Sequence, residues 1–230
     1  KVSVLVQGEM GIGKSSILKE LAKMYPNHIP CYVDLSTKDV GDLLLPKIKT
    51  IDGVDVCEFI PNIEWGLHLN KPLLIMCDEI GKASKGVLNS CLRLLLEHKL
   101  GMYTLPEGSI VFATTNLAVE GVGDNIPPHV RNRICTVKIR KPTPAEWRFG
   151  YAENHGVHPV IIAAAIEYPE MLGSFEHYDR PDQNTYIFDP RCPRAAFVTP
   201  RSLEKASDIL KACSTMAEDT LEHLLIGTVG

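Results

Sequence analysis

The residues with the clearest chemical meaning form one short glycine-rich segment near the start of the chain. Gly8, Gly13, Lys14 and Ser15 occupy every fixed position of the phosphate-loop pattern G-x-x-x-x-G-K-[ST]. In such a loop, backbone N–H groups surround an anion, the lysine reaches the β- and γ-phosphates, and the hydroxyl is a Mg²⁺ ligand. We therefore expect ATP or ADP with Mg²⁺ as cofactors, held by Gly8, Glu9, Met10, Gly11, Ile12, Gly13, Lys14, Ser15 and Ser16.

The segments on either side of this loop have the periodicity that the pattern requires. Residues 2–6 are an apolar run typical of a strand, and residues 16–24 have helical apolar spacing. A helix that begins at the loop adds the positive end of its dipole to the anion site. The alternative interpretation, a strand-to-helix turn that merely contains glycines and a lysine, is disfavoured by this context.

An acidic pair supplies the second part of the predicted site. Asp78 and Glu79 follow residues 72–77, a continuous apolar run typical of a strand buried on both faces. We expect Asp78 to hold Mg²⁺ together with Ser15, and Glu79 to orient or deprotonate the attacking water. The alternative is a solvated acidic pair at a strand end, which the phosphate loop makes the weaker interpretation.

Other polar residues are candidates for contacts with the γ-phosphate. Asn116 follows the apolar run at 109–114 and can hydrogen-bond the attacking water, although an asparagine there could equally form a turn. Arg131 and Arg133 could supply a cation to the transition state, or could belong to a solvated basic face. Arg201 begins a helical pattern, and its alternative is a surface arginine.

Strand and helix patterns alternate over the first part of the chain, which predicts an α/β fold with a mostly parallel five-stranded sheet. Residues 29–35 and 135–139 are the remaining strands, 83–99 is the longest helix, and an Asp-Gly pair centres a hairpin at 47–58. Residues beyond Pro142 show only helices. We therefore expect a nucleotide-binding domain at 1–141 and a helical domain at 142–230. In the first we expect short helices at 39–45, 62–68 and 129–132, a compact turn region at 101–108 and a glycine/proline loop at 121–128. In the second we expect helices at 145–154, 160–168, 202–213 and 216–226 and a long structured loop at 173–200.

Composition narrows the functional classes. With 230 residues and a net charge of −4, the chain lacks the excess of positive charge typical of a nucleic-acid-coating surface. Its seven cysteines are scattered singly, which favours reduced thiols in a cytoplasmic protein. No apolar run is long enough to span a membrane and no signal peptide is visible. The first residue is not methionine and the end follows a helical pattern, so we expect a piece of a longer chain.

Taken in order, these motifs resemble those of AAA+ ATPases, and within them the MoxR type. Gly8–Ser15 resembles Walker A, Leu73–Glu79 Walker B and Ala113–Asn116 sensor 1. Pro127–Ile134 is similar to the segment ending in the arginine finger, with Arg133 at the family's usual position and Arg131 as a second candidate. Thr199–Leu203 resembles sensor 2. The resemblance covers nearly the whole chain and implies an AAA+ domain followed by a small all-helical lid.

The resemblance also implies a ring, usually a hexamer, in which Arg133 completes the ATP site of a neighbour. The hairpin at 47–58 matches the family's insertion in its second helix, so its tip would face the pore and contact a protein client; the alternative is a surface hairpin without client contact. This candidate pore loop is Ile51, Asp52, Gly53 and Val54. Residues 100–106 could be a second, reduced pore-facing hairpin. That compact segment and the loop at 175–197 depart from the pattern of the family. The resemblance also allows a von Willebrand-type protein as a partner.

Three functions follow as expectations. The first is an Mg²⁺-dependent ATP-hydrolysing ring motor that remodels a protein client or complex. The second is a nucleic-acid motor or loader of the same fold, with Lys47, Lys49 and the stretch at 131–148 contacting phosphates, which the acidic net charge disfavours. The third is a nucleotide-gated scaffold with little hydrolysis, which the intact Asp78, Glu79 and Asn116 disfavour.

Overall fold

The computed structural model describes residues 2–117, 126–192, 194–213 and 216–230. The chain forms two compact units. Within the described residues, the first contains 2–7, 14–117 and 126–138. The second contains residues 139–230 together with the short segment Gly8–Gly13, which is most of the phosphate loop.

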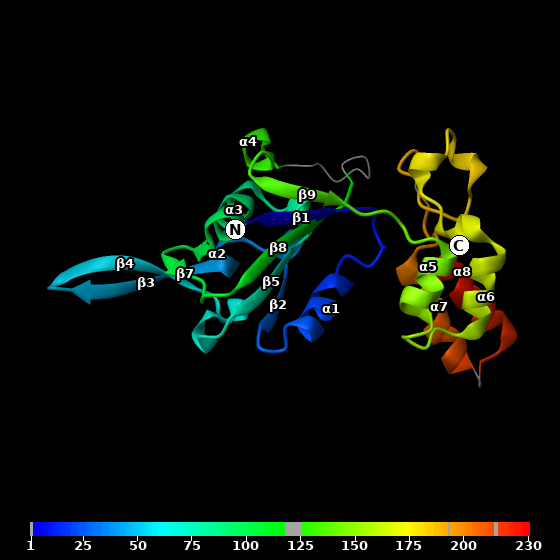
Figure 1. The fold of residues 1–230 in the computed structure, drawn as a ribbon, viewed down its shortest axis with the longest axis horizontal. Helices are drawn as coiled ribbons and strands as arrows, with labels where there is room; N and C mark the ends of the chain where they lie inside the picture. Colours follow the sequence, from blue (N-terminus) through cyan, green and yellow to red (C-terminus); the bar gives the residue numbers. More distant parts are fainter. Residues whose placement is uncertain (1, 118–125, 193, 214–215) are drawn as a thin grey trace. The chain divides into compact units, whose positions relative to one another are not determined.

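The first unit is built on a five-stranded parallel sheet (Figure 1). The order of its strands is β2-β5-β8-β1-β9, so the first strand of the chain lies inside the sheet. All neighbouring strands run parallel, so their carboxyl ends share one edge. The predicted strands are confirmed to within one or two residues: β1 is Ser3–Gln7, β2 Ile29–Asp34, β5 Leu73–Asp78, β8 Ile110–Thr115 and β9 Ile134–Lys138.

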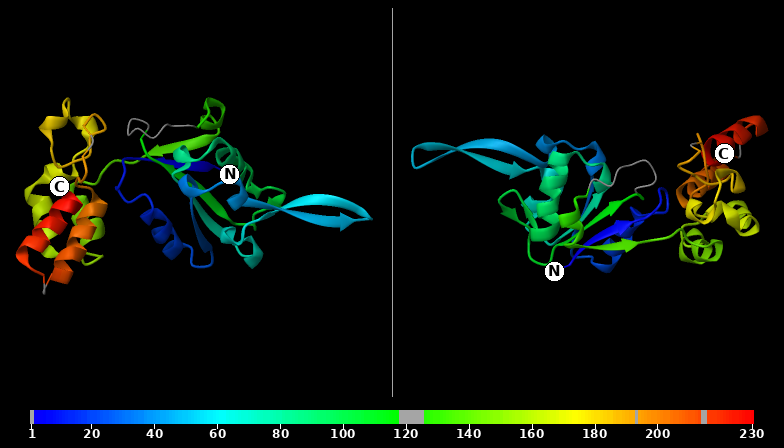
Figure 2. Two further views of the ribbon diagram at one scale, coloured as in Figure 1. Left: turned by 180° about the vertical axis from the view of Figure 1, so that it is seen from behind. Right: turned by 90° about the horizontal axis from the view of Figure 1, so that it is seen from above.

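The central strand β5 is buried along its whole length, which explains its uninterrupted apolar sequence. Alternate residues of the sheet, such as Ile75 and Val111, belong to a core that includes the buried side of helix α3 (Lys85–Glu97). Met76 and Phe112 point to the opposite face, where α1 (Ser16–Met24) contacts β2 and β5. The two helices lie on opposite faces of the sheet (Figure 2).

The longest predicted helix is confirmed with shorter ends. The side chain of Ser84 caps α3 by accepting a hydrogen bond from the backbone N–H of Val87. The helix ends at His98, whose φ of 56° is left-handed. A small hairpin follows, with strands β6 (Lys99–Leu100) and β7 (Tyr103–Thr104), within the segment predicted as a compact turn or reduced hairpin.

The hairpin predicted at 47–58 is confirmed and is longer than expected. Strands β3 (Leu44–Ile51) and β4 (Val54–Pro61) pair over eight residues each and project from the sheet (Figure 1). Asp52 and Gly53 form the tip with φ values of 51° and 78°, as a two-residue turn of the primed type requires. The preceding helix α2 (Val40–Leu43) is shorter than predicted because β3 already begins at Leu44.

One predicted helix of the first unit is wrong in kind. Residues 62–68 form two 3₁₀ turns, Ile63–Trp65 and Leu67–Leu69, rather than one helix. Gly66 lies between them with a left-handed φ of 70° and ends the first 3₁₀ turn after Trp65. The two turns together still bury Trp65 in the core, where its side chain is 1% exposed.

The seven cysteines are all free, as predicted. Cys31, Cys77 and Cys91 are buried in the core of the first unit. Burial raises the pKa of the Cys31 thiol to about 11, and a hydrogen bond with Cys91 together with burial raises the pKa of Cys77 well above its usual value. Such thiols are unreactive, because the thiolate is the reactive form. Cys57, Cys135 and Cys192 are exposed and Cys213 is half-buried.

The described part of the second unit contains helices and irregular segments. Trp147, Ile161 and Leu203 are among the buried residues of its separate core. The segment predicted as a helix at 145–154 is one α-helical turn followed by a π-helical turn at Arg148–Ala152. The α-helical turn is α5 (Pro144–Trp147). The other predicted helices are confirmed with small shifts as α6 (Pro159–Glu167), α7 (Pro200–Ala212) and α8 (Glu218–Val229).

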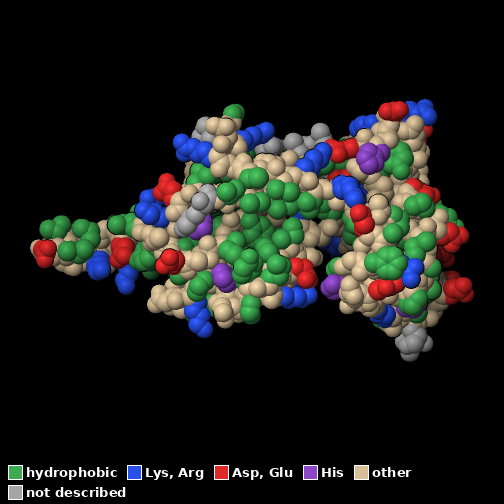
Figure 3. All heavy atoms as spheres, in the orientation of Figure 1, with side chains coloured by type: hydrophobic (Ala, Val, Ile, Leu, Met, Phe, Trp, Pro, Cys, Tyr) green, Lys and Arg blue, Asp and Glu red, His purple; other side chains and the backbone are tan. Residues whose placement is uncertain are grey.

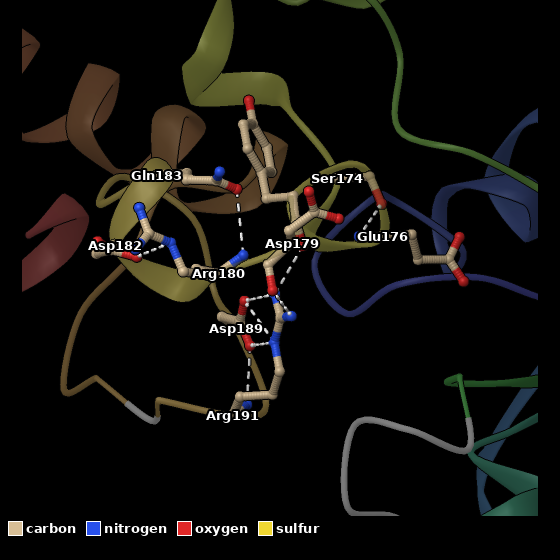
Figure 4. Close-up of polar contacts among 9 residues, drawn as sticks. Ser174, Glu176, Asp179, Arg180, Asp182, Gln183, Asp189 and Arg191 are labelled. Carbon is tan, nitrogen blue, oxygen red and sulfur yellow. Dashed lines mark hydrogen bonds and ion pairs between the residues drawn. The ribbon is translucent and has the colours of Figure 1, made fainter.

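In the segment predicted as a long structured loop at 173–200, the described residues before α7 are irregular apart from two 3₁₀ turns, Phe175–His177 and Pro181–Gln183. Arg191 holds its two halves together (Figure 4). The guanidinium of Arg191 pairs with the buried carboxylate of Asp189 at 2.6 Å and donates to the carbonyl oxygens of Tyr178 and Asp179. This arginine lowers the pKa of Asp189 below its ordinary value.

None of the helices in the described ranges is both long and apolar enough to cross a membrane.

Candidate functional site

The first cluster of predicted site residues lies at the carboxyl edge of the parallel sheet. Lys14 precedes α1, and Asn116 follows β8 directly. The ammonium of Lys14 donates to the side-chain oxygen of Asn116 at 2.6 Å, and both side chains are buried. The two residues that the sequence assigns to the phosphates are therefore in direct contact, because adjacent parallel strands end at the same edge.

Asp78 is the hub of this cluster. Its Oδ2 accepts hydrogen bonds from the hydroxyls of Ser15 at 3.1 Å and Tyr32 at 2.9 Å. Its Oδ1 accepts from the hydroxyl of Thr114 and, at 3.1 Å, from the backbone N–H of Glu79. The carboxylate is 5% exposed, so these four donors replace the water that a buried charge requires.

Glu79 has a strained backbone beside this hub. Its φ of 53° is left-handed, which is uncommon for a residue other than glycine or asparagine. The turn places its half-buried carboxylate 3.1 Å from the ammonium of Lys82. A left-handed residue of this kind persists because the surrounding structure holds it, and such residues are frequent at functional sites.

The glycines of the phosphate loop, which belong to the second unit, meet close neighbours. A Cβ at Gly11 would lie 2.7 Å from the side chain of Thr199, and the carbonyl oxygen of Gly11 accepts from the backbone N–H of Arg201 at 3.2 Å. Gly11 and Gly13 have φ values of 72° and 94°, which only glycine adopts at little cost. The loop thus contacts the first turn of α7, whose N-cap is Thr199.

A second contact of the loop is a buried ion pair. The carboxylate of Glu9 lies 3.0 Å from the ammonium of Lys141, and the two side chains are 7% and 3% exposed. The same ammonium donates to the carbonyl oxygen of Gly173 at 2.8 Å. The pair therefore connects the phosphate loop with the segment after β9 and with the start of the loop at 173–200.

A cavity of about 300 Å³ in the second unit adjoins the phosphate loop. Met10 and Gly11 line it, and the side chains of Arg201 and Lys205 bring two cations to its wall. Arg201 itself is exposed on the first turn of α7.

The remaining predicted residues lie apart from the cluster around Asp78. Arg131 ends the short helix α4 (Pro128–Arg131), and its side chain donates to the carbonyl oxygen of Ile126 at 3.1 Å. Arg133 is exposed just before β9. Most of the glycine-rich loop predicted at 121–128 lies outside the described residues. The tip of the hairpin, Ile51–Val54, is exposed at the end of β3 and β4.

The donor set agrees with what Mg²⁺ and a polyphosphate require. Mg²⁺ takes one or two protein oxygens and completes its shell with water and phosphate. The hydroxyl of Ser15 and the carboxylate of Asp78, 3.1 Å apart, provide two such oxygens. Within the described ranges, no group of three or more His, Cys, Asp or Glu side chains could hold a metal by itself. Lys14 supplies the cation that a phosphate group needs.

Sequence reasoning did not find four participants. Tyr32 and Thr114 donate to Asp78 from neighbouring strands, and Lys82 and Lys141 pair with acidic residues of the predicted motifs. Only Lys82 had a usable signal, since it follows Glu79 by three residues in the turn after β5. The other three depend on strand register and on contacts between distant segments, which no local pattern encodes.

These features define the fold class: an α/β domain with a central parallel five-stranded sheet, a phosphate-loop sequence between its first strand and first helix, and a helical C-terminal region.

The chain matches no protein-family model and no curated protein. Among solved structures it is similar to a mutant of RuvB from Thermotoga maritima, with 11% sequence identity and a TM-score of 0.49. The similarity covers 99% of this chain and 61% of that one, so this chain spans about three fifths of the RuvB chain. A likeness of this extent assigns no activity, substrate or partner.

Proposed function

We propose that this chain is an Mg²⁺-dependent ATPase of the AAA+ class, of the MoxR type, and the motor part of a ring that remodels a protein client. The observation that carries the proposal is the cluster around Asp78. It brings the hydroxyl of Ser15 to a buried carboxylate at 3.1 Å, and it lies beside the contact of Lys14 with Asn116. A site of this kind suits phosphoryl transfer, in which positioning and charge stabilisation do most of the work.

Each residue has a role in this proposal. Lys14 binds the β- and γ-phosphates, and Asn116 holds the lysine or orients the attacking water. Ser15 and Asp78 would hold Mg²⁺, which when bound supplies positive charge to the phosphate oxygens. Glu79 accepts the proton of the attacking water. Its ion pair with Lys82 keeps the carboxylate close to the end of β5 before the reaction.

The proposal extends to a ring because Arg133 has an exposed side chain directly before β9. We propose that this arginine stabilises the charge that develops on a neighbour's ATP, with Arg131 as the alternative, and that Arg201 contributes a further cation. A shared site of this kind requires an oligomer, for which the resemblance favours six subunits.

The test measures phosphate release and particle mass on the same purified protein. Release should require both ATP and Mg²⁺, and chelation of Mg²⁺ should abolish it. Particle mass should rise to that of a ring when Mg²⁺ and ATP are added, because bound nucleotide stabilises the assembled state. A folded protein that neither binds nor hydrolyses ATP contradicts the enzyme; hydrolysis by a persistent monomer contradicts only the ring.

The projecting hairpin supports the proposal of a protein client. Its two strands carry exposed apolar side chains next to charged ones (Figure 3), including Ile48 at 75% exposure and Val54 at 62%. Exposed apolar side chains that gather on one element are typical of an interaction surface. We propose that the tip, Ile51–Val54, contacts the client.

Ile51→Ser should spare basal ATP hydrolysis and abolish client-dependent work, because Ile51 lies at the tip and touches no residue of the site. The measurement compares basal ATP turnover with turnover stimulated by a client, once a client has been captured by crosslinking at the hairpin. Lys23→Ser, on the exposed surface of α1, is the matched control. Normal client stimulation of the Ile51→Ser variant would remove the hairpin from the mechanism.

A further inference from the structure

The start of helix α7 uses an atom of the phosphate loop to complete its hydrogen bonds. An α-helix leaves its first four backbone N–H groups without an acceptor inside the helix. In α7 the proline at the first helical position has no N–H, and the N–H groups of Thr199 and Ser202 bond to each other's hydroxyl oxygens at 2.8 Å and 3.0 Å. The fourth group, the N–H of Arg201, donates to the carbonyl oxygen of Gly11 at 3.2 Å. The loop therefore provides the one acceptor that the helix start does not provide for itself.

The same hydrogen bond fixes a peptide plane of the loop. The C=O of Gly11 and the N–H of Ile12 belong to one planar trans peptide, so a donor that holds the first also sets the direction of the second. The side chain of Thr199 is 5% exposed and lies against this plane, since a Cβ at Gly11 would meet three of its atoms at 2.7, 2.8 and 2.9 Å. Backbone N–H groups are the anion donors of a phosphate loop. The direction of this plane therefore bears on how the loop binds phosphate.

We infer that Thr199 is a positioning residue of the nucleotide site, which holds the first turn of α7 in place and thereby presets the phosphate loop. The inference rests on the proposed function. With the cap intact, the N–H of Arg201 is held at the carbonyl oxygen of Gly11 before nucleotide arrives, so the loop is already ordered when it binds. Without the hydroxyl of Thr199, the N–H of Ser202 loses its acceptor and the first turn frays, so only a fraction of the molecules present the ordered loop.

An N-cap that serves stability alone would behave differently. Its loss would lower the thermal unfolding midpoint, but the folded variant would bind nucleotide as the wild type does. A positioning N-cap adds a loss of affinity, because the apparent Kd rises as the binding-competent fraction falls. The coupling is also reciprocal, so bound nucleotide must stabilise the first turn of α7.

The experiment measures the Kd of ADP with Mg²⁺ by calorimetry for the wild type, Thr199→Val and Thr199→Ser, below the unfolding midpoint of every sample. Valine keeps the shape of threonine but cannot accept the hydrogen bond from Ser202. Thr199→Val should therefore bind about fivefold more weakly, which corresponds to the typical effect of losing one N-cap. Serine keeps the hydroxyl, so Thr199→Ser should bind within about twofold of the wild type.

Thr143→Val is the matched control, because Thr143 is the N-cap of α5 in the same unit and accepts a hydrogen bond from the backbone N–H of Glu146 at 3.3 Å. This variant loses the same kind of cap and should keep wild-type affinity. Wild-type affinity of the folded Thr199→Val variant overturns the inference. An equal loss in Thr143→Val overturns it too, and so does a Thr199→Ser variant that binds as weakly as Thr199→Val.

Hydrogen exchange of the wild type decides the matter if Thr199→Val does not fold. Saturating ADP should slow the exchange of the backbone N–H groups of Arg201 and Ser202 relative to that of Glu146 in the first turn of α5. Exchange at Arg201 and Ser202 that ADP leaves unchanged overturns the inference. A folded wild type that binds no nucleotide overturns the proposed function and this inference with it. Nucleotide binding that is equal in the wild type and Thr199→Val overturns this inference alone.

Discussion

Glu79→Gln is expected to bind ATP as the wild type does and to lose between about a hundredfold and ten-thousandfold of its turnover, the range that general base catalysis contributes. Glutamine has nearly the shape of glutamate but cannot accept the proton of the attacking water. The substitution also removes the ion pair with Lys82, in which the side chains of Lys82 and Glu79 are 34% and 22% exposed. A pair that is partly open to water contributes little to stability, so the fold should tolerate the change.

The measurement is a single-turnover and steady-state comparison of phosphate release, together with the Kd for ATP. Glu97→Gln is the matched control, because Glu97 lies in the same unit and pairs with Arg93 at 2.9 Å. The Glu97→Gln variant loses a comparable ion pair but changes no residue of the site. Unchanged turnover of the Glu79→Gln variant would remove Glu79 from the role of base.

Lys14→Met is expected to weaken ATP binding by about one to two orders of magnitude, because a hydrogen bond to a charged group contributes about 1.5–3 kcal/mol. Methionine has a similar length but no charge. The 2.6 Å hydrogen bond to Asn116 disappears as well. Leaving the buried amide oxygen without its donor costs about 1–3 kcal/mol of stability, partly offset because a buried ammonium no longer loses its hydration.

The Kd for ATP and the thermal unfolding midpoint of the same samples separate the two effects. Lys19→Met changes an exposed lysine of α1 in the same way and should leave both quantities as they are. If Lys14→Met binds ATP with wild-type affinity, then the loop is not a phosphate site and the ATPase proposal fails with it.

The parts of this fold that could be predicted are those in which local pattern and local structure coincide. The apolar run at 72–77 is a buried strand because both of its faces are covered, and the Asp-Gly pair at 52–53 gives a hairpin because both residues reach positive φ. The order of the strands was not predictable. It depends on β1 lying between β8 and β9, and periodicity carries no information about neighbours.

For the candidate site, the sequence predicted which residues end the strands but not what they would touch. That Lys14 meets Asn116 follows from two strand ends at one edge of a sheet. That Tyr32 donates to Asp78 depends on the register of β2 against β5, in which Tyr32 lies opposite Met76. The pairing of Glu9 with Lys141 depends on the path of the chain after β9. The strand register and the path of the chain are set by the packing of the whole core, so short motifs could not reveal them.

The distribution of the cysteines gives the protein an intrinsic reporter of its own opening. In the native chain, a thiol-specific dye should react readily with Cys57, Cys135 and Cys192, while Cys31, Cys77 and Cys91 stay protected. All three protected thiols lie in the core of the first unit, and Cys77 directly precedes Asp78. The delayed labelling phase therefore times the opening of this core, to which the strand with the central carboxylate belongs, so the effect of nucleotide on the core can be followed without introducing any new residue.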